Sequence, residues 1–378
     1  MSFVSSAKMK ADIIVGAEQI ERYLPLLLNK RVGLVVNQTS RVFDTHLVDM
    51  LLANNIDITA IFSPEHGFRG NLDAGEKFDS SIDTKTGIPL VSLYGKNKKP
   101  STSSLKNIDV LVFDIQDVGV RYYTYISTMH YIMEAAAENN IKLIILDRPN
   151  PNGRFVDGPI LEENFRSFVG MHAIPLLHGM TVGELAKMIQ GEGWLNTKKT
   201  LDLTIVKLKN YQRDMHYDLP IKPSPNLPNA QSIALYASLG FFEATPVSIG
   251  RGTHFPFQVI GHHKYHLGNF TFIPISMPGT ARKPKLMNSK LTGQDLRLIN
   301  SHGLDLSYLI SWYEIFASAN TVFFSSPAFM DKLAGTDKLR KAIILGQSAE
   351  QIKKTWQPAL QRFKSQRKPY LLYPDIIK

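Results

Sequence analysis

Residues 110–146, VLVFDIQDVGVRYYTYISTMHYIMEAAAENNIKLIIL, contain a complete strand–helix–strand unit and decide the fold. Val110–Ile115 is a short apolar run, and Leu143–Leu146 is a second one. Between them, residues 124–139 have apolar side chains at helical spacing and end at Asn139-Asn140, which suits a helix C-terminus. Two apolar strands joined by a helix predict parallel strands that are buried on both faces.

The same alternation continues on both sides of this unit. Further strands are predicted at residues 31–37, 58–62, 90–94 and 203–208, with helices at 45–54 and 181–190. The second helix begins with a capping box formed by Thr181 and Glu184. The pattern predicts an α/β fold with a Rossmann-like, mostly parallel sheet.

A proline-rich segment, LPIKPSPNLP at residues 219–228, interrupts the alternation and marks a crossover to a second domain. Beyond it we predict a strand at 270–275 and helices at 306–316 and 349–363. We therefore divide the chain into a Rossmann-like catalytic domain, residues 1–215, and a smaller α+β domain, residues 216–378, that completes the cleft.

Composition narrows the possible partners. The 43 Lys and Arg residues exceed the 33 Asp and Glu residues by ten, which favours anionic partners. The basic residues are scattered and no nucleic-acid motif is present, so we expect no nucleic-acid partner. The absence of cysteine excludes disulfides, thiolate zinc sites and a cysteine nucleophile. No apolar run approaches the roughly 20 residues of a membrane span, and the first residues lack a signal-peptide core.

Polar residues follow four of the predicted strands. These clusters are Asn37-Gln38-Thr39, Ser63–His66, Gln116-Asp117 and Asp147–Asn150. Because ligands of open α/β sheets bind beyond the carboxyl ends of the strands, we expect the clusters to converge on one cleft.

Two acidic residues in the segment after residue 62 are candidate catalytic groups. Glu65, in SPEHGFRG, lies in a turn where partial burial would raise its pKa and suit it to general-acid work. Glu76, in DAGE, is the weaker candidate for the second carboxylate of a glycosidase. The alternative is that these carboxylates cap or hold surface turns.

Three other segments are candidates for substrate binding. Arg121 suits an anionic group and Tyr123 suits a sugar ring, although Arg121 has the alternative of an ion pair with Asp114 or Asp117. Asn150 suits sugar hydroxyls, or else a turn. Arg251, in IGRGT, is exposed by flanking glycines, but the segment lacks the residues of a nucleotide-binding loop. A structural ion pair with Glu243 is the alternative for this arginine.

Metal and hydrolase motifs are also missing. The neighbouring His262, His263 and His266 have no HExxH pattern and no acidic partner close by, so we expect no metal and no other cofactor. The sequence has no GxSxG elbow for a serine nucleophile.

These segments, taken in order, resemble one bacterial family, the exo-β-N-acetylmuramidases, which were long described as a domain of unknown function. The matching stretches run from about Gly16 to Tyr373 and include SPEHGFRG, FDIQDVGVRYYTYISTMHY, LDRPNPNG, PSPNLP, SIGRGT and LAGTDKLR. The sequence departs from the family pattern near residues 239–246 and at HHKYH, residues 262–266, which bears on the exact sugar or leaving group.

The resemblance implies removal of terminal N-acetylmuramic acid from peptidoglycan fragments, in a cleft between two domains and outside the cytoplasm. It implies that Glu65 is the catalytic acid/base. The substrate-binding candidates at the cleft are then His66, Arg69, Asn37, Gln116, Asp117, Arg121, Tyr123, Asn150 and Arg251. A non-catalytic wall-binding protein that uses the same cleft is the alternative, and an esterase or amidase acting on wall peptides is a second one.

Overall fold

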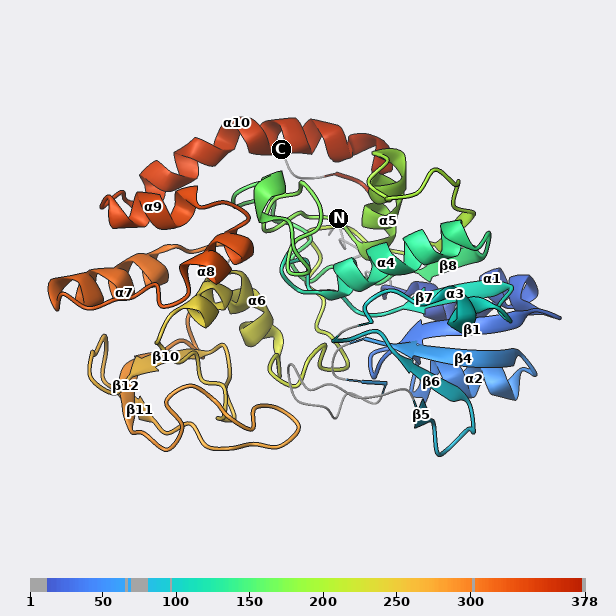
Figure 1. The fold of residues 1–378 in the computed structure, drawn as a ribbon, viewed down its shortest axis with the longest axis horizontal. Coiled ribbons are helices and arrows are strands. Elements are labelled where there is room, and N and C mark those ends of the chain that lie inside the picture. Colours follow the sequence, from blue (N-terminus) through green and yellow to red (C-terminus); the bar gives the residue numbers. More distant parts are fainter. Residues whose placement is uncertain (1–11, 65–66, 69–80, 96, 301–302, 376–378) are drawn as a thin grey trace, which may run out of the picture.

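The computed structural model describes residues 12–64, 67–68, 81–95, 97–300 and 303–375. Its first domain is built on a seven-stranded sheet with the strand order β5-β6-β4-β1-β7-β8-β9 (Figure 1). The strands are β1 (Arg31–Val36), β4 (Asp57–Ser63), β5 (Ser81–Ile82), β6 (Pro89–Ser92), β7 (Val110–Asp114), β8 (Lys142–Leu146) and β9 (Leu203–Val206). All neighbours pair in parallel except β5 with β6.

The six parallel strands follow the order third, second, first, fourth, fifth, sixth, which is that of a doubly wound Rossmann sheet. This confirms the predicted α/β fold class. The strand order reverses between β1 and β7, so the carboxyl ends of these two strands border the crevice where such folds place their ligands.

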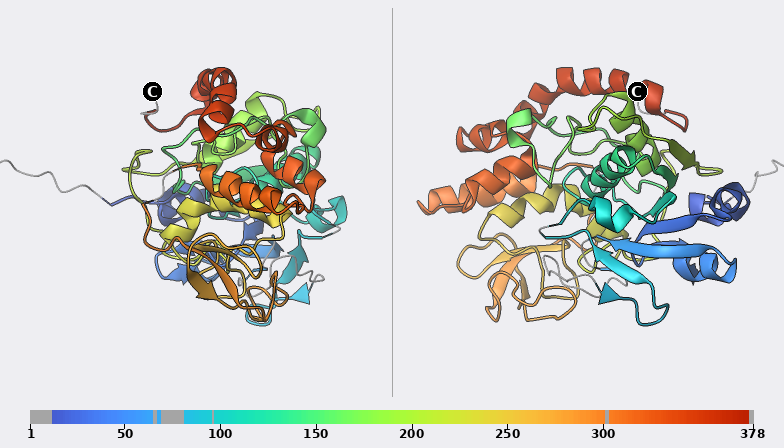
Figure 2. Two further views of the ribbon diagram at one scale, coloured as in Figure 1. Left: turned by 90° about the vertical axis from the view of Figure 1, so that its left-hand side faces the viewer. Right: turned by 45° about the vertical axis from the view of Figure 1, so that its right-hand side comes forward.

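Helices cover both faces of the sheet, and the strand sequences explain why. Alternate residues of each strand belong to two separate apolar cores, so a nearly continuous apolar strand is buried on both sides. One core lies under α4 (Tyr125–Glu138) and α5 (Val182–Gly191), and the other lies under α1 (Ile20–Leu27) and α2 (Leu47–Ala53) (Figure 2). The short α3 (Thr102–Leu105) leads into β7.

The second domain combines a small antiparallel sheet with helices. Its strands are ordered β10-β12-β11, with bounds β10 (Val259–His262), β11 (Phe270–Phe272) and β12 (Leu291–Asp295). Its helices are α6 (Ala230–Leu239), α7 (Ser307–Ser318), α8 (Pro327–Ala334), α9 (Lys338–Ile344) and α10 (Ala349–Arg367). A two-stranded ribbon, β2 (Arg41–Val42) with β3 (Thr45–His46), and four short 3₁₀ helices complete the described elements: η1 (Gly16–Glu18), η2 (Glu163–Phe165), η3 (Gly240–Ala244) and η4 (Lys368–Tyr370).

The chain returns to the first domain at its end. Helix α10 runs along the outside of the molecule from the second domain towards α5 (Figure 1). The hydroxyl of Tyr373 then donates to Asp147 Oδ2 at 2.6 Å, and the amide of Leu372 donates to Glu184 Oε1 at 2.8 Å. The two domains are therefore joined by the crossover after β9 and by these C-terminal contacts.

Most predicted elements form, with instructive differences. The capping box of Thr181 and Glu184 is present at the start of α5. The predicted helix at 45–54 begins only at Leu47, because Thr45 and His46 pair with Arg41 and Val42. In the described part of the chain, no helix is both long and apolar enough to span a membrane.

Candidate active site

A cavity of about 890 Å³ lies between the carboxyl ends of the strands and the second domain. Tyr94, after β6, and Tyr122, just before α4, line it from the first domain. From the second domain come Tyr236 on α6, Glu243 in η3 and Arg251, followed by residues 280–285. We call this cavity the cleft.

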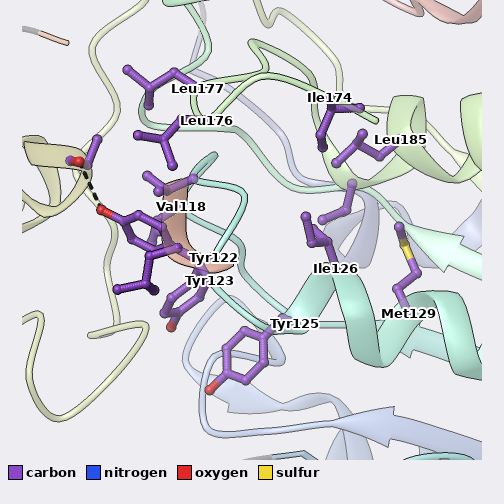
Figure 3. Close-up of a cluster of buried hydrophobic side chains, with 14 of the residues drawn as sticks. Val118, Tyr122, Tyr123, Tyr125, Ile126, Met129, Ile174, Leu176, Leu177 and Leu185 are labelled. Atoms are coloured by element: carbon purple, nitrogen blue, oxygen red, sulfur yellow. Dashed lines mark hydrogen bonds between the residues drawn. The ribbon is translucent and has the colours of Figure 1, made fainter. Parts of the chain in front are cut away.

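A row of tyrosines between β7 and α4 connects the two domains at the cleft. The hydroxyl of Tyr122 donates to the carbonyls of Tyr236 and Ala237, at 2.7 and 2.9 Å (Figure 3). The hydroxyl of Tyr123 donates to the carbonyl of Pro223 at 2.7 Å. Burial raises the pKa of both tyrosines well above the ordinary value, so both remain neutral phenols.

Arg251 is held at the cleft by two contacts. Its Nε donates to Glu243 Oε1 at 2.6 Å, and its guanidinium carbon lies 5.0 Å from the centroid of Phe257. Both charged side chains keep 27% of their surface exposed, so the pair borders solvent. Burial alone would raise the pKa of Glu243, but the charges of Arg251 and Lys285 outweigh it and lower the pKa. Glu243 is therefore an ionised partner and does not suit the role of a proton donor.

The ammonium group of Lys285 forms its hydrogen bonds within the second domain. Its Nζ donates to the carbonyls of Phe242, Glu243 and Thr245 at 2.7–2.9 Å. These three bonds account for all donors of the ammonium group, so Lys285 fixes the backbone of η3.

A small cavity of about 80 Å³ adjoins the cleft beneath Tyr122 and Arg251. Asn226, which lines it, is 2% exposed. Its Nδ2 donates to the carbonyl of Thr280 at 2.9 Å, whereas its Oδ1 has no hydrogen-bond partner in the described part of the chain. A buried acceptor without a partner is costly, and a donor on a bound ligand would satisfy it.

Three of the predicted binding residues at the strand ends are buried, and their side chains form hydrogen bonds within the loops that follow the strands. Asn37 Oδ1 accepts from the amide and the hydroxyl of Thr39. Gln116 Nε2 donates to the carbonyls of Asp117 and Pro149, both at 2.7 Å. Asn150 Oδ1 accepts from the amide of Asn152, and its Nδ2 donates to the carbonyl of Met180. None of the three lines the cleft, although Asn37 Nδ2 has no hydrogen-bond partner among the residues that the structure describes.

Arg121 does not face the cleft, and this corrects the expectation that it meets a substrate carboxylate. It is fully buried, and it donates to the carbonyls of Pro159 and Ile174 and to those of Leu333 and Ala334 at the end of α8. The guanidinium thus connects the two domains by capping a helix C-terminus.

The alternative ion pair of Arg121 with Asp114 or Asp117 is also wrong. Asp114 pairs with Arg148, whose Nε and Nη2 donate to its carboxylate at 2.6 and 2.9 Å. The polar cluster after β8 is likewise internal, because Asp147 accepts from Thr181 and Tyr373. The described polar side chains directly after β1, β7 and β8 therefore fix the conformation of the loops beside the cleft and do not line it.

Four predicted site residues, Glu65, His66, Arg69 and Glu76, lie outside the described residues. The structure does describe the end of the preceding strand, β4, at Ser63. The amide of Gly67 donates to the carbonyl of Pro64 at 3.1 Å.

Asp117 is buried, and its Oδ1 has no hydrogen-bond partner within the described ranges of the chain. Its titration predicts how stability depends on pH. Burial raises its pKa to about 7, against the lowering effect of the amides of Gly119 and Val118. The pKa of an aspartate in the unfolded chain is about 3.9. Between about pH 4 and 7 the folded protein therefore keeps Asp117 protonated while the unfolded chain has lost that proton. The free energy of unfolding consequently falls as the pH rises through this window. Asp117→Asn keeps an acceptor for Gly119 but cannot ionise.

We therefore expect Asp117→Asn to melt higher than wild type at pH 8 and to differ little at pH 4. Melting curves from pH 4 to 8 measure this. The melting temperature of the variant should still fall with rising pH, but by less, because burial also raises the pKa of Asp147, to about 6. Parallel curves for the two proteins would contradict the assignment to Asp117.

Several residues at and beside the cleft had no binding role in the sequence analysis. Asn226, in the wall of the small cavity, lies within PSPNLP, which is interpreted there as a crossover and as a family match. Tyr236 and Glu243 line the cleft itself; the sequence suggested Glu243 only as an ion-pair partner of Arg251, and the structure confirms that pair. All three lie between the start of the crossover and the glycine-flanked Arg251.

Comparisons with known proteins agree with this architecture. The N-terminal family model of exo-β-N-acetylmuramidase NamZ matches residues 32–231, and the C-terminal model matches residues 234–373. The chain is 42% identical over 375 residues to the peptidoglycan β-N-acetylmuramidase NamZ of Bacillus subtilis (strain 168), covering 93% of this chain and 89% of that protein.

Two crystal structures of DUF1343 family proteins from Bacteroides fragilis share the whole fold. One is 48% identical, with a TM-score of 0.89 and coverage of 97% of this chain and 100% of that one. The other is 31% identical, with a TM-score of 0.83 and coverage of 96% and 99%. Since the two family models adjoin at residues 231 and 234 and together span nearly the whole chain, the chain belongs to the exo-β-N-acetylmuramidase NamZ family.

Proposed function

We propose that this protein is a glycoside hydrolase that releases terminal β-linked N-acetylmuramic acid from peptidoglycan fragments. The relative from Bacillus subtilis is named as a peptidoglycan β-N-acetylmuramidase, and the similarity extends over both domains that form the cleft. The Rossmann-like sheet then serves as a scaffold, since fold alone does not fix function.

The observation that carries the proposal is Arg251, which lines the cleft together with Arg282, Lys283 and Lys285. N-acetylmuramic acid differs from N-acetylglucosamine by its lactyl ether, which carries a carboxylate. A selective site needs a fixed cation, and a guanidinium matches a carboxylate better than an ammonium does. Arg251 is oriented by Glu243 and Phe257, while Lys285 is committed to backbone carbonyls.

The proposed chemistry needs a proton donor for the leaving oxygen and a group that stabilises the oxocarbenium-like transition state. We assign the proton to Glu65. It protonates the glycosidic oxygen as that oxygen leaves the anomeric carbon, and a water molecule then supplies the hydroxyl of the released sugar. The second group is Glu76 or the N-acetyl oxygen of the substrate itself.

The small cavity beside the cleft offers a place for a substrate amide or hydroxyl. Asn226 Oδ1 is a buried acceptor there, and the neutral phenols of Tyr122 and Tyr123 border it. A neutral, donor-bearing part of the sugar fits this lining better than its carboxylate does.

The test is hydrolysis of a chromogenic β-N-acetylmuramide beside the matching β-N-acetylglucosaminide. We expect release from the muramide and much slower release from the glucosaminide, because only the muramide offers a carboxylate to Arg251. Binding of both sugars without release would favour a non-catalytic wall-binding protein. Release of acyl or amide products from wall peptides, without sugar release, would favour the esterase or amidase.

A further inference from the structure

A second cavity, of about 740 Å³, lies next to the cleft in the first domain. Phe168 belongs to the walls of both cavities, so the two are neighbours. The rest of the wall of the second cavity comes from Lys98, from α4, from residues 163–173, and from residues 193–196 just after α5. Its volume lies in the range of about 300–1,000 Å³ that is typical of small-ligand sites.

The second cavity presents flat aromatic faces. The rings of Tyr131 and Phe168 are stacked, with centroids 6.3 Å apart and an interplanar angle of 13°. Trp194 stacks on His172, with centroids 5.4 Å apart at 26°. Tyr131, Phe168 and Trp194 are each only partly buried. Such rings pack well against the C–H faces of a sugar ring.

A buried polar chain ends at the same wall. Glu134 Oε1 bonds to His130 Nε2, and His130 Nδ1 bonds to His172 Nε2, each at 3.0 Å. The other nitrogen of His172, Nδ1, is buried without a hydrogen-bond partner in the described residues, and so is Ser167 Oγ. Whichever tautomer the histidines adopt, a hydroxyl group satisfies Nδ1, because it both donates and accepts.

The buried carboxylate of this wall, Glu134, is neutralised internally, and the more exposed Lys98, Glu163 and Arg166 also line the cavity. Burial alone would raise the pKa of Glu134, but hydrogen bonds from His130 and from the amide of Asn196 lower it to about 2. The ammonium group of Lys99 neutralises the carboxylate from 3.2 Å. The buried part of the wall therefore favours a neutral ligand with several hydroxyls over a charged peptide.

We propose that the second cavity binds a neutral sugar residue on the leaving-group side of the scissile bond, beyond the terminal residue held in the cleft. This inference rests on the proposed function, because it assigns a longer glycan to the same site. The bound glycan would then pass over Phe168, where the Lys98 ammonium lies 4.4 Å from the ring centroid.

Trp194 makes binding directly observable. The other two tryptophans, Trp312 and Trp356, are 0% and 7% exposed, so Trp194 dominates quenching by iodide. In the Glu65→Gln variant, a peptide-free tetrasaccharide of alternating N-acetylmuramic acid and N-acetylglucosamine should protect the fluorescence from iodide. N-acetylmuramic acid alone should not, because it occupies only the cleft.

Kinetics provide the second test. Trp194→Ala should lower kcat/KM for the tetrasaccharide about tenfold and leave the chromogenic muramide unchanged, and Trp194→Phe should recover part of the loss. Tyr308→Ala is the matched control, since Tyr308 is a partly buried aromatic residue in the wall of an unrelated cavity. It should affect neither substrate.

Three outcomes would overturn the assignment. Equal loss on both substrates in Trp194→Ala would indicate a structural role, and no loss on either would indicate that the glycan passes elsewhere. Protection by muramyl dipeptide but not by the peptide-free glycan would make the cavity a peptide site. Failure of the wild type to cleave the muramide would instead refute the proposed function, and the fluorescence measurement would still test the cavity.

Discussion

Replacing Glu65 by glutamine is expected to slow cleavage of an unactivated muramyl disaccharide about a hundredfold or more. The amide keeps the shape of the carboxyl group but cannot deliver a proton to the leaving oxygen, and general acids contribute about 10²–10⁴ in rate. Glu65 follows β4, which pairs with β1, and β1 borders the crevice at which the strand order reverses. The measurement is kcat/KM for the disaccharide in both proteins, with melting curves to verify that folding is unchanged.

The leaving group supplies the control for this variant. A nitrophenyl muramide needs little protonation, so the same variant should lose much less activity on it. Glu76→Gln is the matched second variant, because it removes the other candidate carboxylate from the same segment. If Glu65→Gln keeps a near-normal rate on the disaccharide, Glu65 is not the acid. If azide restores activity to Glu76→Ala and the product is the α-glycosyl azide, Glu76 is the nucleophile of a retaining mechanism.

The sequence was sufficient for the sheet because its signals are local. Strands such as Val110–Asp114 are short apolar runs, and their burial on both faces leaves no other environment for them. The order of the strands was not predicted, because right-handed parallel units restrict the possible orders without selecting one. The small sheet of the second domain was harder to predict from the sequence. Its central strand, β12 (Leu291–Asp295), contains polar residues although it pairs with strands on both sides.

The site was harder to predict than the fold, because burial of a polar residue is not visible in sequence. Arg121 and Arg251 have similar polar and aromatic neighbours in sequence, yet one caps α8 and the other borders the cleft. Asn226 and Glu243 reach the cleft only because the crossover brings α6 and η3 against the tyrosines before α4. Such distant contacts depend on tertiary packing, on which local patterns carry no information.

Replacing Arg251 by alanine is expected to remove selectivity for the muramide. Loss of one partner of a desolvated charge pair costs about 2–5 kcal/mol, and the partial exposure of Arg251 favours the lower end, which is about thirtyfold in kcat/KM. The glucosaminide has no lactyl carboxylate, so its slow hydrolysis should change little. The quantity to measure is the ratio of kcat/KM for the two sugars in wild type and variant.

Arg297→Ala is the matched control for this experiment. Arg297 also pairs with a carboxylate in the second domain, Asp295 at 2.6 Å, and it also lies over aromatic rings, 4.9 Å from the centroids of Phe255 and Phe270. It does not line the cleft, so its loss should leave the ratio unchanged. If Arg251→Ala lowers activity on both sugars equally, together with the melting temperature, its pair with Glu243 is structural. The lactyl group must then be recognised by another cation, and Arg282, which also lines the cleft, and Arg69 are the next candidates.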